Sequence, residues 1–218
     1  MRARAAGRKK SDRKEVPLSD AIDLNGVTVL KGRLDRAAQA SLVEEVRTIA
    51  RAAPLTAYET PGGRRMSVRM TAAGRVGWVS DRSGYRYAPT HPSGIPWPPI
   101  PASILSIWRA ETGVDRDPDC CLVNYYAEGA KMGMHQDRDE GDLSWPVLSI
   151  SLGDTARFRV GGTTRGGPTQ SLLLESGDVA LLSGAGRLAY HGIDRVLDGS
   201  SRLLPNGGRI NLTLRVVA

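Results

Sequence analysis

The sequence predicts a mainly β protein with flanking helices (α+β), built around a double-sheet jelly roll. Short alternating or apolar segments, separated by turns, recur from Asp119 to the C-terminus, and two segments of helical periodicity precede them. Strands that follow helices in this way are typical of a β-sandwich covered by helices. At 218 residues the chain is long enough for one such domain with a sizeable core.

The N-terminal elements follow from periodicity and from helix start and stop signals. A first strand is expected at 27–30. Asp35 suits the N-cap of a helix that Pro54 ends. Residues 66–70 alternate like a strand, and a second helix is expected at 102–111, after a proline-rich crossing.

The second half of the chain contains eight candidate strands joined by turns. They are residues 120–126, 131–137, 147–152, 157–160, 171–174, 179–182, 188–191 and 209–217. The segments 161–167 and 198–208 contain several glycines and are expected to be loops.

Residues 1–16 form a basic tail that we expect to be disordered. The first 15 residues carry +5 of the net charge of +7. Such a tail is either a solubilising segment or an arm that raises affinity for phosphate backbones. Charge alone does not choose between the two.

The cysteines and the hydropathy of the chain indicate the cellular compartment in which we expect the protein. Cys120 and Cys121 are neighbours, so a bridge between them would be strained, and we expect reduced thiols and a cytoplasmic location. No apolar run reaches about 18 residues and no apolar stretch follows the charged N-terminus, so we expect neither a membrane span nor a signal peptide.

The motif His135-Gln136-Asp137 decides the chemistry. Side chains two positions apart on a strand share a face, so the histidine and the aspartate can face one ion. His191 can complete a set of two imidazoles and one carboxylate, which suits Fe(II) and leaves three open positions. A lone His-x-Asp is more often a surface pair, but the chain has only three histidines and the third, His91, lies in the proline-rich crossing.

The C-terminal strand alternates polar and apolar side chains. Arg209, Asn211, Thr213 and Arg215 share one face, and the two guanidinium groups lie about 20 Å apart along the strand. One interpretation is an ordinary amphipathic strand with a solvated polar face. The other is a pair of arginines that bind the two carboxylates of a five-carbon diacid.

Four motifs in a fixed order resemble the AlkB family of Fe(II)- and 2-oxoglutarate-dependent dioxygenases, which repair alkylated nucleobases by oxidative dealkylation. They are Asn124-Tyr125-Tyr126, His135-Gln136-Asp137, Tyr190-His191-Gly192 and the strand Arg209–Arg215. The resemblance covers roughly residues 55–217 and implies Fe(II), with 2-oxoglutarate and O2 as cosubstrates. It implies that the metal ligands are His135, Asp137 and His191. It also implies that Arg209, Asn211 and Arg215 bind 2-oxoglutarate, helped by Asn124 and Tyr126, with Tyr125 contributing only its backbone.

The resemblance also implies a lid that recognises the nucleotide. An enzyme that acts on a base must take it out of its stack and hold it between aromatic or apolar surfaces. Aromatic residues make up 5% of the chain, yet Trp78, Tyr85 and Tyr87 lie close together, with Met70 before them and Arg86 among them. Such mixing suits a single-stranded backbone with stacked bases. The alternative is that the aromatic residues only pack this segment onto the barrel.

Two further base contacts are implied by the resemblance. Asp139 meets the exocyclic amine and the positive charge of an alkylated base, since 1-methyladenine and 3-methylcytosine are cationic at neutral pH. Arg165, in the loop 161–167, is the second contact. Arg138 and Glu140 are expected to face away from the base, because alternate residues of a strand change faces.

We therefore expect a tail (1–16), N-terminal helices with the nucleotide-recognition lid (17–115) and a jelly-roll dioxygenase core (116–218). The expected reaction is dealkylation of N-alkylated bases in DNA, with RNA as a second candidate, yielding formaldehyde, succinate and CO2. Single-stranded DNA and a monomeric enzyme are the default expectations. Two alternatives stay open: a hydroxylase of a protein or small molecule with the same cofactors, and a nonenzymatic nucleic-acid-binding protein.

Overall fold

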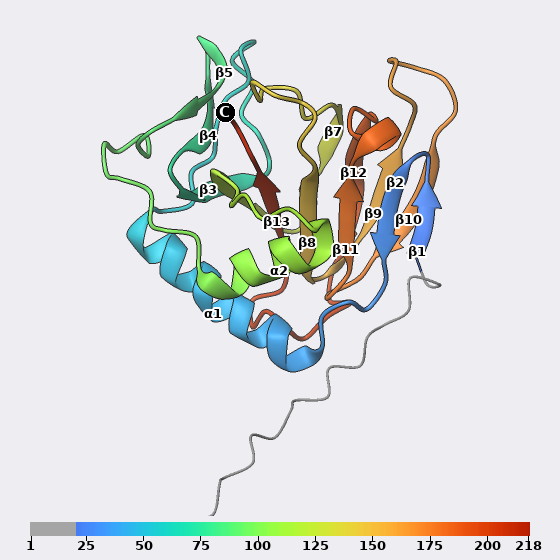
Figure 1. Ribbon diagram of the computed structural model, residues 1–218. Helices are drawn as coiled ribbons and strands as arrows, with labels where there is room; N and C mark the ends of the chain where they lie inside the picture. The colour runs from blue at the N-terminus through green and yellow to red at the C-terminus, as the bar shows by residue number, and fades with distance from the viewer. Residues whose placement is uncertain (1–20) are drawn as a thin grey trace, which may run out of the picture.

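Two antiparallel β-sheets face each other, and two helices cover the outer side of the larger sheet (Figure 1). This arrangement confirms the predicted jelly roll with flanking helices. The computed structural model describes residues 21–218. The predicted tail, residues 1–16, lies outside the described residues.

The elements have the following bounds. The large sheet contains β1 (Ala21–Leu24), β2 (Val27–Leu30), β3 (Arg69–Gly74), β6 (Cys120–Tyr126), β8 (Val147–Gly153), β11 (Val179–Leu182) and β13 (Arg209–Arg215). The small sheet contains β7 (Met132–His135), β9 (Thr155–Val160), β10 (Gln170–Leu174) and β12 (His191–Leu197). A separate hairpin consists of β4 (Gly77–Asp81) and β5 (Gly84–Ala88), and the helices are α1 (Arg36–Ala52), α2 (Ala102–Thr112) and the short 3-10 turn η2 (Gly184–Gly186).

The strand order of the large sheet is β1-β2-β11-β8-β13-β6-β3, and that of the small sheet is β10-β9-β12-β7. β2 pairs with β11, and β3 pairs with β6. Strands from both sides of the expected boundary near residue 115 therefore share one sheet.

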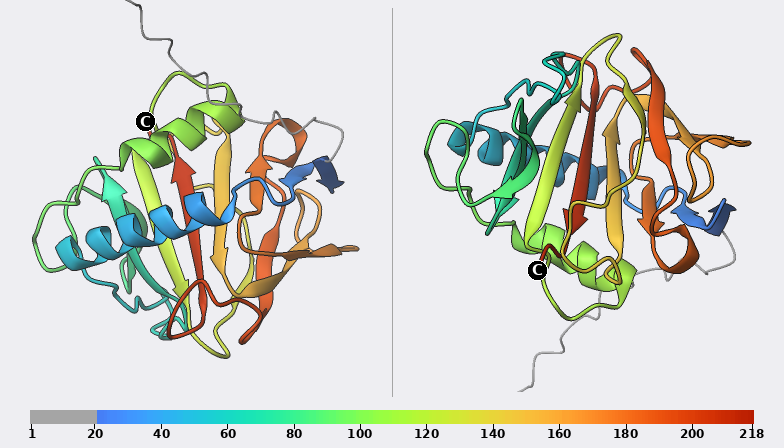
Figure 2. Two further views of the ribbon diagram at one scale, coloured as in Figure 1. Left: turned by 90° about the horizontal axis from the view of Figure 1, so that it is seen from below. Right: turned by 90° about the horizontal axis from the view of Figure 1, so that it is seen from above.

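Both helices pack on the outer face of the large sheet. Asp35 caps α1, accepting a hydrogen bond from the backbone N–H of Ala38 at 2.8 Å, and the helix ends just before Pro54, as predicted. Apolar residues of α1 and α2, among them Leu42 and Trp108, form one core with the outer side of the sheet. Figure 2 shows α1 (blue) and α2 (green) lying across this face. Neither helix in the described part of the chain is long and apolar enough to cross a membrane.

Strand β13 contributes to both sides of the large sheet. Its apolar residues, including Leu212 and Leu214, join the core under the helices. Its polar residues point to the opposite side, between the two sheets, and all seven residues of the strand are buried. The interpretation of a solvated polar face is therefore wrong.

Several segments differ from the sequence prediction. β3 begins three residues later than expected, and β4 and β5 were not predicted as strands. β12 begins at His191 rather than ending there, because the preceding residues form a turn whose carbonyls bond to side chains. The Leu188 carbonyl accepts from Gln136, and the Ala189 carbonyl contacts the ring of His191.

A tight glycine contact joins the N-terminal hairpin to the turn before His191. The connection between β1 and β2 is Asn25-Gly26, with φ of 51° and 84°, a left-handed conformation that favours glycine and asparagine. A Cβ on Gly26 would lie 3.1 Å from the Cα of Gly186, and a Cβ on Gly186 would lie 2.0 Å from the carbonyl oxygen of Gly26. The two turns therefore pack backbone to backbone.

Asp154 anchors the loop that leads into β13. Its buried carboxylate accepts the backbone N–H groups of Ser201 and Gly208, each at 2.9 Å. We expect Asp154→Ala to lower the free energy of unfolding by about 2–4 kcal/mol, because these donors lose their acceptor. Urea unfolding measures the change. The control is Asp198→Ala, at an exposed carboxylate of the same loop, with an expected change within about 0.5 kcal/mol. Equal losses in both variants would contradict the anchoring role.

Candidate active site

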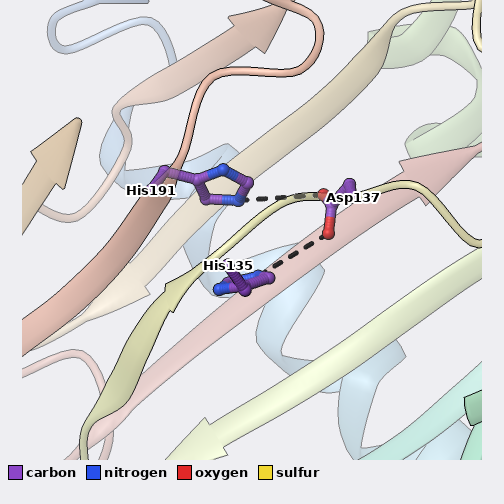
Figure 3. A group of neighbouring side chains, drawn as sticks. All are labelled: His135, Asp137 and His191. Atoms are coloured by element: carbon purple, nitrogen blue, oxygen red, sulfur yellow. Dashed lines mark ion pairs between the residues drawn. The ribbon is translucent and has the colours of Figure 1, made fainter. Parts of the chain in front are cut away.

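His135, Asp137 and His191 converge on one point (Figure 3). Their ligand atoms all lie within 4.8 Å of one another. The two carboxylate oxygens of Asp137 lie 3.6 Å from His135 Nε2 and 3.8 Å from His191 Nε2. The histidines meet because β7 and β12 are neighbouring strands in which His135 and His191 are direct partners. The structure thus brings together the three predicted ligands.

Backbone carbonyls orient both imidazole rings. His135 Nδ1 lies 2.9 Å from the Gly133 carbonyl, and His191 Nδ1 lies 3.0 Å from the Ala189 carbonyl. Because a carbonyl only accepts, the Nδ1 of each ring carries a proton, and the Nε2 of each ring faces the carboxylate of Asp137. Burial, together with the neighbouring His135, lowers the pKa of His191 to about 4, so this ring is neutral at pH 7 and able to bind a metal.

Asp137 is held by two arginines. Burial alone would raise the pKa of its carboxyl, but Arg215 and the two histidines hold that pKa well below its usual range. The nearest contact is Arg215 Nη2, at 2.7 Å. On the backbone side, the carbonyl of Asp137 accepts from Arg187 Nη1 at 2.6 Å. β7 ends at His135 rather than continuing to Asp137 as predicted, because its partner β12 begins at His191, the residue paired with His135.

Arg209 is a buried cation with no charged partner in direct contact among residues 21–218. It is 1% exposed, and only Nη2 is bonded, donating to Ser151 Oγ at 2.9 Å. Its Nε and Nη1, and the Oδ1 of the nearby Asn124, find no hydrogen-bond partner among residues 21–218. Burial lowers the pKa of Arg209 to about 10, which leaves it charged at pH 7. A buried charge with free donors fits an anionic ligand such as the carboxylate of 2-oxoglutarate.

The other predicted cosubstrate residues lie on neighbouring strands. Asn211 donates from Nδ2 to Ser149 Oγ at 2.7 Å, and its Oδ1 lies 3.4 Å from Asn124 Nδ2. Tyr126 is buried among the residues between the sheets. The side chain of Tyr125 lies on the other face, packed against the core under the helices.

The hairpin β4–β5 presents an aromatic pair beside Asp139. The rings of Trp78 and Tyr85 stack with centroids 5.4 Å apart and an interplanar angle of 20°. Trp78 Nε1 donates to Asp139 Oδ2 at 2.9 Å, and Tyr58 packs its edge against Trp78 at 6.0 Å. Tyr85 is among the exposed large hydrophobic residues, whereas Met70 is 2% exposed and belongs to the core. The structure thus brings Trp78 and Tyr85 together with Asp139, which follows Asp137 by two positions in the sequence.

Arg86 and Arg165 are not gathered with this group. Arg86 lies on the opposite face of β5 from the two tyrosines and pairs with Asp81 at 2.7 Å. Arg165 is exposed in the loop between β9 and β10. That loop is fixed to the metal motif, because Gln136 Nε2 donates to the Thr163 carbonyl at 3.0 Å.

The prediction that Glu140 faces away is wrong. Glu140 is buried, accepts a hydrogen bond from the hydroxyl of Tyr87 at 2.7 Å, and lies 3.3 Å from Arg215 Nε and 3.2 Å from Arg187 Nη2. Strand alternation no longer applies there, because β7 has already ended. Arg187 was missed as well, since no motif or periodicity marks it.

This fold, with two histidines and one carboxylate beside buried arginines, defines the class of 2-oxoglutarate- and Fe(II)-dependent oxygenases. A family model of the 2OG-Fe(II) oxygenase superfamily matches residues 26–215. The chain is 56% identical to an alpha-ketoglutarate-dependent dioxygenase AlkB homolog of Caulobacter vibrioides, over 87% of each chain. It is 43% identical to alpha-ketoglutarate-dependent dioxygenase AlkB of Escherichia coli, over 87% of this chain and 89% of the other.

A solved structure agrees with these sequence comparisons. That of OsALKBH1 superposes with a TM-score of 0.75 at 30% identity, covering 90% of this chain and 99% of the other. The chain belongs to the AlkB family, and it is an Fe(II)- and 2-oxoglutarate-dependent dioxygenase.

The two buried arginines of β13 predict opposite effects on stability. Arg215→Met leaves the carboxylates of Asp137 and Glu140 buried without this cation, so we expect the free energy of unfolding to fall by about 3–5 kcal/mol. Arg209→Met removes a buried charge with two unbonded nitrogens, so we expect little loss or a gain. Urea unfolding without metal or 2-oxoglutarate measures both. If Arg209→Met lowered the free energy of unfolding more than Arg215→Met does, the argument that Arg209 is the less compensated charge would be wrong.

Proposed function

We propose that this enzyme removes alkyl groups from ring nitrogens of nucleobases, in DNA first and in RNA as a second substrate. In this reaction 2-oxoglutarate becomes succinate and CO2, and a methyl group leaves as formaldehyde. One observation carries the proposal: a stacked aromatic pair, the half-buried Trp78 and the exposed Tyr85, lies beside Asp139, a carboxylate two residues from Asp137. Membership of the AlkB family supports it.

The proposed metal ligands are His135, Asp137 and His191. Bound Fe(II) would supply the oxygen activation that hydroxylates the alkyl group. The protein supplies two imidazoles oriented by backbone carbonyls, of which His191 is neutral at pH 7, and an ionised carboxylate. No protein nucleophile is needed.

The proposed cosubstrate residues are Asn124, Tyr126, Arg209, Asn211 and Arg215. Arg209 would take one carboxylate of 2-oxoglutarate with its two unbonded nitrogens. Arg215, which contacts Asp137, would act on the part of the cosubstrate nearest the metal. Tyr125 would take part only through its backbone.

The proposed base contacts are Trp78 and Tyr85 as stacking surfaces and Asp139 as the charged acceptor. A carboxylate attracts the cationic 1-methyladenine and 3-methylcytosine and offers no such attraction to the neutral normal bases. Met70 would line the floor below the hairpin, and Tyr87 would act through Glu140. Arg86 and Arg165, both on the surface, would contact the phosphate backbone.

We also propose a monomeric enzyme that prefers single strands, since the exposed ring of Tyr85, stacked on Trp78, suits unpaired bases. A cytoplasmic location agrees with Cys120 and Cys121, which are buried free thiols. A hydroxylase of proteins or small molecules is the second candidate, but it leaves the placement of Trp78 and Tyr85 beside Asp139 without a role.

A repair assay tests the proposed function. Purified protein, Fe(II), ascorbate and 2-oxoglutarate are mixed with a single-stranded oligonucleotide that carries one 1-methyladenine, and the product mass is measured. We expect the loss of one methyl group, which disappears with His135→Ala or without 2-oxoglutarate. Succinate without methyl loss would move the search to other substrates. Neither product, from folded and iron-loaded protein, would reject the nucleobase reaction.

Substitution of the acidic base contact tests charge recognition. We expect Asp139→Asn to lower kcat/KM for 1-methyladenine by about 10–100-fold, because a charge-assisted hydrogen bond is lost. For 3-methylthymine, a neutral lesion, the change should be less than about threefold. Parallel assays with the two oligonucleotides give the comparison. Equal losses on both lesions would mean that Asp139 does not read charge.

A further inference from the structure

Arg187 connects the two chain segments that carry Asp137 and His191. It follows η2 directly, four positions before His191, and is 4% exposed. Its guanidinium uses all three nitrogens. Nε donates to the Trp145 carbonyl at 2.7 Å, Nη1 donates to the Asp137 carbonyl at 2.6 Å, and Nη2 pairs with Glu140 at 3.2 Å.

The three acceptors all belong to the segment between β7 and β8. Within residues 21–218 this segment pairs with no strand, since β7 ends at His135 and β8 begins at Val147, and one backbone bond, from the Gly141 N–H to the Val217 carbonyl at 2.8 Å, ties it to the residues after β13. Arg187 therefore fixes the segment against the turn that precedes β12. The same turn orients the ring of His191 through the Ala189 carbonyl.

Glu140 joins this arginine to the cosubstrate side of the centre. One of its oxygens pairs with Arg187, and the other lies 3.3 Å from Arg215 Nε. Arg215 in turn contacts the carboxylate of Asp137. Arg187 thus binds the main-chain carbonyl of Asp137, and Arg215 binds its side-chain carboxylate. Glu140 contacts both arginines and fixes their positions relative to each other.

We infer that Arg187, fixed by Glu140, is a positioning residue for the metal centre: it sets the separation of Asp137 and His191. The inference rests on the proposed function in one respect, namely that these residues ligate the metal. Ligands held at the right separation before the metal arrives bind it more tightly, and loss of such a supporting contact typically weakens metal affinity by about 10–100-fold.

Cobalt binding provides the test. Co(II), a redox-stable divalent probe, is titrated into the metal-free full-length protein, and its visible absorption gives the Kd and reports the ligand geometry. Arg187→Lys keeps the charge but cannot reach three acceptors, so we expect its Kd to rise about 10–100-fold with an altered spectrum. Thermal unfolding is measured in parallel.

Arg33→Lys is the matched control. Arg33 pairs with both carboxylate oxygens of Glu111 on α2, at 2.9 Å each, on the helix-covered side of the large sheet. We expect this variant to lose some thermal stability while its cobalt Kd stays within about twofold of wild type. A folded Arg187→Lys protein with wild-type Kd and spectrum would overturn the inference and leave Arg187 a purely structural residue.

Two further variants test the inference if Arg187→Lys does not fold or if the metal site itself is wrongly assigned. If Arg187→Lys does not fold, Glu140→Gln keeps the shape of the acceptor but removes its charge, and we expect a cobalt Kd raised about tenfold. Unchanged affinity in that variant would overturn the inference. Failure of the proposed metal site looks different, because His135→Ala would then bind cobalt as well as the wild type.

Discussion

The polar face of β13 lies buried between two sheets, and the rest of the architecture depends on this constraint. A guanidinium enclosed in a protein is costly unless acceptors surround it. Arg215 lies between the carboxylates of Asp137 and Glu140, so its charge is compensated even though its Nε makes no hydrogen bond within residues 21–218. Arg209 has no such ion pair in this part of the chain, and its one side-chain hydrogen bond there goes to Ser151. The protein without cosubstrate therefore holds one weakly compensated charge, and a dicarboxylate that neutralises it also stabilises the folded state by mass action.

The parts of the molecule that the sequence predicted are those with a local period. The strand at 120–126 and the first helix lie where they were expected, and the C-terminal strand, predicted at 209–217, begins as expected and ends two residues earlier, at Arg215. The three candidate ligands were identified from their residue types, their spacing and the resemblance of the surrounding motifs to the AlkB family. The roles of Glu140 and Arg187 could not be predicted, because they depend on contacts between segments far apart in the sequence. Arg187 donates to the backbone carbonyls of Asp137 and Trp145, and Glu140 contacts the side chains of Tyr87, Arg187 and Arg215. Such bonds depend on tertiary placement and leave no repeating pattern in the sequence.

On the proposed function, base recognition is an exchange of donors. Without substrate, Asp139 accepts a hydrogen bond from the indole N–H of Trp78. The exocyclic amine of a bound base either displaces the Trp78 N–H or donates to the other oxygen of the carboxylate. Asp139 therefore accepts at least one hydrogen bond both before and after the base binds. The gain from binding then depends mainly on the positive charge of the base, which separates a lesion from the unmodified base.

The contact between Gly26 and Gly186 extends the requirements of the metal centre to the N-terminal hairpin. A Cβ on Gly186 would collide with the Gly26 carbonyl, and a Cβ on Gly26 would press on the Gly186 backbone and strain a left-handed turn. The turn at Gly186 runs directly into Arg187 and on to His191. A random-mutagenesis screen that scores survival under alkylating agents should therefore recover substitutions at residue 26. In such a screen the hairpin would look like part of the active site, although it lies more than a hundred positions away along the chain.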